Sequence, residues 1–81
     1  MVAEPVEIEV DARGLLCPLP VLRLRKRLLG AAQGQVVRLL ATDPAAVIDV
    51  PHFCAQGGHE LLEALALPDG ATAYRVRAAP A

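Results

Sequence analysis

The chain has 81 residues, 54% of them hydrophobic but only Phe53 and Tyr74 aromatic, so it allows one small domain with an aliphatic core. Its formal net charge of −1 gives no global field that favours nucleic acid or a membrane surface. The cysteines, Cys17 and Cys54, are too few for a disulfide-rich secreted scaffold and lack the paired spacing of a zinc site. With no signal-peptide pattern and no uncharged run long enough to span a bilayer, these features predict a reduced, cytoplasmic protein.

The first half of the chain predicts a strand followed by a helix. Residues 6–10 alternate apolar and acidic side chains, which is typical of a half-buried strand with Val6, Ile8 and Val10 inward. Residues 11–14 are expected to form the loop that follows, where Gly14 permits a turn that other residues resist.

From Cys17 onward the hydrophobic period changes to that of a helix. An apolar stripe of helical spacing follows, made of Val21, Leu24, Leu28 and Ala31 or Ala32. Prolines are tolerated in a first helical turn, so Pro18 and Pro20 predict that the helix begins beside Cys17. Gly30 and Gly34 are the expected end of the helix. The basic residues Arg23, Lys26 and Arg27 are spaced to share the opposite face, which is either a solvated face or a docking surface.

The second half predicts a strand, a helix and a final strand, with one ambiguous segment. Residues 35–41 form the second strand, and helix-length material between two strands predicts a parallel βαβ unit. Asp43 and Pro44 predict the start of a helix over 44–56, which Pro51 should break or kink and Gly57-Gly58 should end. Residues 59–67 have strong helix propensity but are flanked by turn signals, and residues 72–77 alternate as a strand. Residues 78–81 are expected to be a loose tail.

Several short motifs match one known family. They are Asp11, Gly14-Leu15, Cys17-Pro18-Leu19-Pro20 and Arg25-Lys26, followed by Asp43-Pro44-Ala45, Asp49, Pro51, Phe53-Cys54 and Gly58-His59-Glu60-Leu61. On these residues the chain, from about residue 8 to 77, resembles the TusA or SirA-like family of small sulfur-carrier proteins. The resemblance implies an α/β fold: a two-layer α/β sandwich of βαβαββ order, with a four-stranded mixed sheet and two helices on one face. It makes residues 59–67 a strand, and we expect a single domain over 1–81 with an ordered core at about 6–78.

Cys17 is the candidate site. A free thiol is mostly protonated at neutral pH, and a helix N-terminus offers unpaired N–H groups and partial positive charge that favour a sulfur anion. Because Pro18 and Pro20 donate no N–H, the amides of Leu19 and Val21 are the expected local partners. The resemblance implies that Cys17 takes up a sulfane sulfur as a persulfide and releases it to an acceptor, with Pro18 and Pro20 as supporting motif residues. No cofactor or metal is implied.

Other candidate residues have competing interpretations. Cys54 is expected to pack in the core, although an auxiliary thiol stays open. Asp43 either only caps a helix or also contributes to a partner-facing surface. His52 and His59 are the only candidates for a Cys–His pair, and each is expected to be a surface or hydrogen-bonded structural histidine. A thioredoxin-like redox role is disfavoured, because Cys17 has no second cysteine three residues on.

The predicted function is therefore that of a sulfurtransferase acting as a protein-bound sulfur carrier. The resemblance implies a cysteine desulfurase or rhodanese-like donor and an acceptor sulfur-transfer protein, in relays such as tRNA 2-thiouridine synthesis, molybdenum cofactor synthesis or sulfur oxidation. Arg23, Lys26 and Arg27 are expected to border the Cys17 end of the helix and to dock an acidic partner. We expect a monomer with transient complexes, no membrane and no direct nucleic acid. The alternatives are a thiol redox sensor and a non-catalytic regulatory or RNA-binding module.

Overall fold

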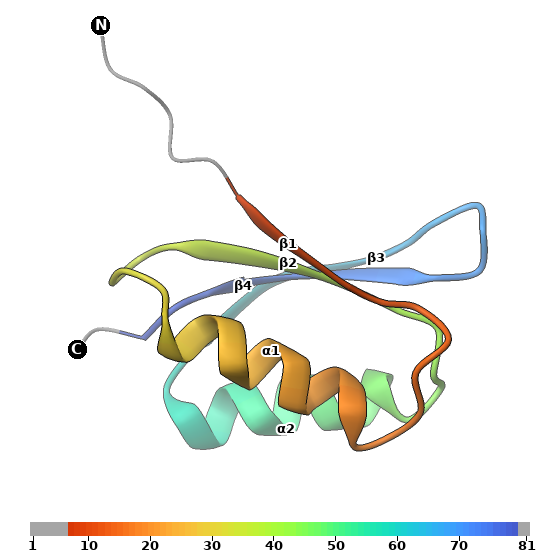
Figure 1. The fold of residues 1–81 in the computed structure, drawn as a ribbon, viewed down its shortest axis with the longest axis horizontal. Coiled ribbons are helices and arrows are strands. Elements are labelled where there is room, and N and C mark those ends of the chain that lie inside the picture. The colour runs from red at the N-terminus through yellow and green to blue at the C-terminus, as the bar shows by residue number, and fades with distance from the viewer. Residues whose placement is uncertain (1–6, 80–81) are drawn as a thin grey trace, which may run out of the picture.

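The structure, a computed structural model, describes residues 7–79. Within that range the chain forms, in order, β1 (Ile8–Ala12), α1 (Leu19–Leu29), β2 (Val36–Ala41), α2 (Ala46–Gly57), β3 (Glu60–Ala66) and β4 (Thr72–Arg77) (Figure 1). The predicted βαβαββ order is confirmed.

The four strands described form one mixed sheet in the order β1-β2-β4-β3. β1 and β2 are parallel, as predicted for a βαβ unit, whereas β4 is antiparallel to both β2 and β3. Both helices pack on the same face of this sheet (Figure 1). Because β1 and β2 are parallel, the loops that follow them emerge at the same end of the molecule.

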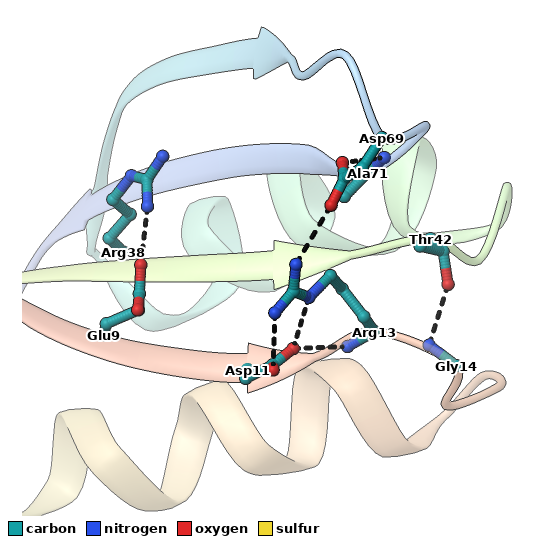
Figure 2. Close-up of polar contacts among 8 residues, drawn as sticks. All are labelled: Glu9, Asp11, Arg13, Gly14, Arg38, Thr42, Asp69 and Ala71. Atoms are coloured by element: carbon teal, nitrogen blue, oxygen red, sulfur yellow. Dashed lines mark hydrogen bonds and ion pairs between the residues drawn. The ribbon is translucent and has the colours of Figure 1, made fainter.

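The core lies between the sheet and the two helices. Its largest fully buried side chains come from α1, from α2 and from the two central strands: Leu24, Val50, Val37, Leu39, Tyr74 and Val76. Each such aliphatic side chain contributes about 1.5–3 kcal/mol when it leaves water. The alternate residues of the strands face away from the helices and form exposed ion pairs, such as Glu9 with Arg38 (Figure 2).

β3 resolves the ambiguous segment in favour of strand. Glu60–Ala66 pairs antiparallel with β4, with an irregularity in register between Leu61 and Glu63. Leu61 packs against the core, and Glu63 forms an ion pair with Arg75 of β4. Pairing with β4 and this burial outweigh the helix propensity of the segment, because strand formation depends on packing context.

The first strand differs from the prediction at both ends. β1 includes Asp11 and Ala12, which the sequence assigned to the loop, because Ala12 pairs with Ala41 of β2 and is buried. Val6 lies outside the described residues.

The predicted loose tail is also wrong in part. Ala78 is buried, donates its N–H to Gln35 O at 2.8 Å and accepts an N–H from Gly34 at 3.3 Å.

The second helix begins later than predicted and is not interrupted. It starts at Ala46, with Ala45 as its cap in place of Asp43, and it continues through Pro51. Pro51 and Val47 are both exposed, so water can reach the Val47 carbonyl that Pro51 leaves without an N–H donor. As predicted, glycine ends the helix: Gly58 adopts φ 72° and donates its N–H to Cys54 O.

Candidate functional site

Cys17 lies in the loop between β1 and α1, immediately before Pro18, the N-cap of α1. Its side chain is exposed, and its peptide bond to Pro18 is cis. Pro20 lies in the first turn of α1, as predicted, and is buried, whereas Pro18 precedes the first turn as the N-cap. Cys17 therefore lies just outside the helix, in the loop after β1, and the loops after β1 and β2 lie at the same end of the molecule (Figure 1).

Two side chains of the loop after β2 hold the Cys17 loop. The N–H of Gly14 donates to Thr42 Oγ1 at 2.9 Å (Figure 2), and the N–H of Cys17 donates to Asp43 Oδ2 at 2.6 Å. The other carboxylate oxygen of Asp43 accepts the N–H of Ala45 at 3.3 Å. Asp43 thus joins the loop that carries the thiol to the turn that precedes α2, instead of capping that helix.

Arg13 anchors the start of the same loop. Its guanidinium contacts Asp11 at 2.9 Å and reaches Asp69, in the turn between β3 and β4, at 3.0 Å (Figure 2). Hydrogen bonds from the side chain and the backbone N–H of Arg13 lower the pKa of Asp11 to about 2. Arg13 therefore connects the start of the Cys17 loop to Asp11 in β1 and to the turn between β3 and β4.

The nearest polar partner of the Cys17 sulfur is Asp49, in the first turn of α2. Sγ donates a hydrogen bond to Asp49 Oδ2 at 3.0 Å. This hydrogen bond, followed by desolvation and the charges of Asp49 and Asp43, raises the pKa of the Cys17 thiol. The expectation that the pKa of the Cys17 thiol is lowered is therefore wrong, because the neighbouring carboxylates raise it.

One of the two amides predicted to donate to the Cys17 sulfur has a different partner. The N–H of Leu19, one of the two expected donors, instead donates to the carbonyl of Leu16 at 2.9 Å. Asp49 is one of the residues that match the family motifs, but the sequence alone indicated no role for it. The available signal was its place in the first turn of a helix that follows a parallel strand, and the structure was needed to relate that turn to Cys17.

A shallow groove of about 270 Å³ runs beside the thiol between α1 and α2. It is lined by Cys17, Pro18, Val21, Asp49, His52, Phe53 and Gln56. His52, expected to be a surface or hydrogen-bonded histidine, is exposed and lines this groove. His59 has the structural environment expected of it: its ring stacks on Phe53 with centroids 5.4 Å apart, and its Nδ1 accepts the N–H of Ala79 at 2.9 Å.

The two cysteines are in opposite environments. Both are free thiols, but Cys17 is exposed while Cys54 is 2% exposed and belongs to the core. Burial raises the pKa of the Cys54 thiol. Cys54 therefore has the packing role expected of it, and an exchange with external sulfur donors would require the core to open.

The basic residues of α1 lie elsewhere than expected. Arg23, Lys26 and Arg27 line a separate groove of about 650 Å³ between α1 and β1, together with Leu19, Leu22 and residues 9–11. Lys26 and Arg27 are in the last turn of α1, so the prediction that this basic face borders the Cys17 end is wrong. Within residues 7–79 none of the three forms an ion pair, unlike the arginines of the sheet.

Comparisons with known proteins agree with this fold. The family model described as Sulfurtransferase TusA matches residues 8–78. The sulfur carrier protein TusA of Allochromatium vinosum is 51% identical over 55 residues, covering 68% of this chain and 72% of that protein. That of Pseudomonas syringae pv. syringae is 39% identical over 72 residues, covering 89% and 84%.

A solved structure shows the same architecture. The SirA-like protein of Desulfitobacterium hafniense superposes with a TM-score of 0.80 at 27% identity, covering 90% of this chain and 99% of that one. Within residues 7–79 the structure has no helix long and apolar enough to cross a membrane. The fold, the family model and the relatives agree with the sequence motifs, and the chain belongs to the TusA family of sulfur carrier proteins.

Proposed function

We propose that Cys17 is the residue on which this sulfur carrier bears its sulfur, as a persulfide. The observation that supports this proposal is the contrast between the two thiols: Cys17 is exposed beside an open groove, and Cys54 is enclosed in the core. A carrier thiol has to reach the sulfur of one protein and then of another, and Cys17 is the thiol that is open to both.

The chemistry consists of two displacements of the thiol-exchange type. In loading, the Cys17 sulfur attacks the sulfane sulfur of a donor persulfide, the donor thiolate leaves, and the Cys17 proton passes to solvent or to that leaving thiolate. In unloading, an acceptor thiolate attacks the terminal sulfur, and Cys17 leaves with the electron pair of the broken S–S bond. No electrons are gained or lost overall.

The surface around Cys17 fits transient docking. Leu16, next to the thiol, is 69% exposed, and Ile48, in the first turn of α2, is 73% exposed. Exposed apolar side chains around a reactive group are typical of protein-binding surfaces. Asp43 supports this surface by holding the loop. The cations Arg23, Lys26 and Arg27, which form no ion pair within residues 7–79, offer a second contact for an acidic partner.

The partners follow from this chemistry by class. A cysteine desulfurase or a rhodanese-like protein is the proposed donor, and a sulfur-transfer protein with a reactive cysteine is the proposed acceptor. Thiolation of tRNA, molybdenum cofactor synthesis and sulfur oxidation are the candidate relays, in the cytoplasm. Since Cys54 is buried, a redox sensor that pairs it with Cys17 is not favoured.

Intact mass spectrometry tests the proposal. The wild-type protein, Cys17→Ser and the control Cys54→Ser are each incubated with a cysteine desulfurase and labelled cysteine. We expect a gain of one sulfur atom, lost on reduction, in wild type and Cys54→Ser but not in Cys17→Ser. Equal loading of Cys17→Ser and wild type contradicts the proposal, and a loss of two hydrogens on mild oxidation would favour the sensor.

A further inference from the structure

The contact between Cys17 and Asp49 depends on whether the carrier is empty or loaded. A carboxylate can only accept hydrogen bonds, so the 3.0 Å contact between Sγ and Asp49 Oδ2 requires a proton on the sulfur. In a persulfide the inner sulfur is bonded to Cβ and to the terminal sulfur and has no proton to donate. The hydrogen bond is thus available to the empty carrier and lost on loading.

The charges that face the sulfur reinforce this difference. Asp49 from α2 and Asp43 from the preceding turn both act on Sγ, and His52 is the other titratable side chain lining the same groove. The cations Arg23, Lys26 and Arg27 line the groove on the β1 side of α1. A thiolate, or a charged terminal sulfur of a persulfide, therefore meets carboxylates that repel it, whereas the helix N-terminus favours it.

We propose that Asp49 is a positioning residue that stabilises the empty Cys17 thiol by a hydrogen bond, disfavours the persulfide, and so biases the carrier towards giving up its sulfur. The inference rests on the proposed carrier role of Cys17. After the acceptor thiolate has taken the terminal sulfur, Cys17 leaves as a thiolate, gains a proton from solvent and donates it in the hydrogen bond to Asp49. In the loaded state, repulsion from Asp49 directs the terminal sulfur away from α2 and towards the solvent.

Asp49→Asn tests the inference, since it removes the charge with little change in shape. Asp49→Glu restores the charge, and Glu60→Gln removes a carboxylate on the far face of the sheet, where Glu60 pairs with Arg77. The first measurement is the pH profile of Cys17 alkylation by iodoacetamide, followed in the Cys17 peptide by mass spectrometry so that Cys54 does not interfere.

For Asp49→Asn we expect the midpoint of the alkylation profile at lower pH. The rate at neutral pH should rise only about twofold, because the more abundant thiolate is also less nucleophilic. Asp49→Glu and Glu60→Gln should keep the profile of the wild-type protein. An unchanged or higher midpoint in Asp49→Asn, or an equal shift in Glu60→Gln, overturns the inference.

The second measurement is the loaded fraction at equilibrium with glutathione persulfide and glutathione. We expect a ratio of loaded to empty Cys17 about fivefold higher in Asp49→Asn, the effect of one charge about 4 Å away in water. An unchanged ratio overturns the proposed bias. Loading by glutathione persulfide needs no partner protein, so this measurement is independent of the desulfurase assay. Failure of the proposed carrier role would appear only in the desulfurase assay.

Discussion

Asp43→Ala is the most informative single change, because Asp43 connects the Cys17 loop to the rest of the fold. Its carboxylate accepts the N–H of Cys17 at 2.6 Å and that of Ala45 at 3.3 Å. Alanine removes both acceptors and leaves two backbone N–H groups to water. The variant tests whether the loop that carries the thiol is held by this residue.

The expected loss follows from these two contacts. Hydrogen bonds to a charged acceptor contribute about 1.5–3 kcal/mol each, but the half-exposed position of Asp43 and the length of one contact reduce the expected contribution to about 1 kcal/mol each. We therefore expect Asp43→Ala to lower the free energy of unfolding by about 2 kcal/mol, a fall in Tm of roughly 8–16 °C for a domain of this size. Asp43→Asn keeps one of the two oxygens and should lose about half as much.

Urea unfolding measures the stability, and amide hydrogen exchange locates the effect. In Asp43→Ala the N–H of Cys17 should exchange faster, while the amides of β4 should follow only the global change in stability. Glu60→Ala is the matched control, because its exposed ion pair with Arg77 should contribute less than about 1 kcal/mol. The reasoning is refuted if Asp43→Ala is as stable as wild type, or if the Cys17 amide keeps its protection.

Reversing Lys26 and Arg27 to Glu should slow sulfur transfer from the desulfurase but leave loading by glutathione persulfide unchanged. The control Arg25→Glu, a change outside the groove of about 650 Å³, should leave the transfer rate as in wild type. Equal transfer rates in all three proteins would exclude this groove as a docking site. A further prediction concerns the stability of the fold at acidic pH. Because the pKa of Asp11 is lowered from 3.8 to about 2 by Arg13, its stabilising contribution is complete above pH 3.8 and is lost as pH falls through 2. Arg13→Gln should therefore flatten this part of the stability profile measured by urea unfolding, and an unchanged profile would show that the pair does not stabilise the fold.

Most of the fold was predictable because its signals are local. The alternation of Ile8 and Val10, and the helical spacing of Leu24 and Leu28, place those side chains in the core, where the structure has them. Gly58 is the C-cap that ends the second helix, as predicted. Pro51 misled the prediction because a single proline on an exposed face costs one hydrogen bond, which the rest of the helix outweighs.

β3 shows where local signals fail. The segment Glu60–Ala66 has helix-forming residues, and sequence propensity alone did not decide its state. The family resemblance indicated a strand, and the pairing with β4 and the contact of Leu61 with the core are the physical cause. Such contacts join residues far apart in the chain, so no window of local sequence contains them.

The sequence by itself placed a cysteine beside a helix start and, through its motifs, indicated that the chain belongs with the sulfur carriers. Only the tertiary structure decided which groups surround that sulfur. Cys17 and Asp49 are 32 residues apart, and they meet because parallel pairing of β1 and β2 brings the starts of α1 and α2 to one end of the sheet. Local reasoning predicted a sulfur favoured as an anion by the helix, whereas the fold adds two carboxylates that raise the pKa of the thiol, because the charge at a site depends on every element packed around it.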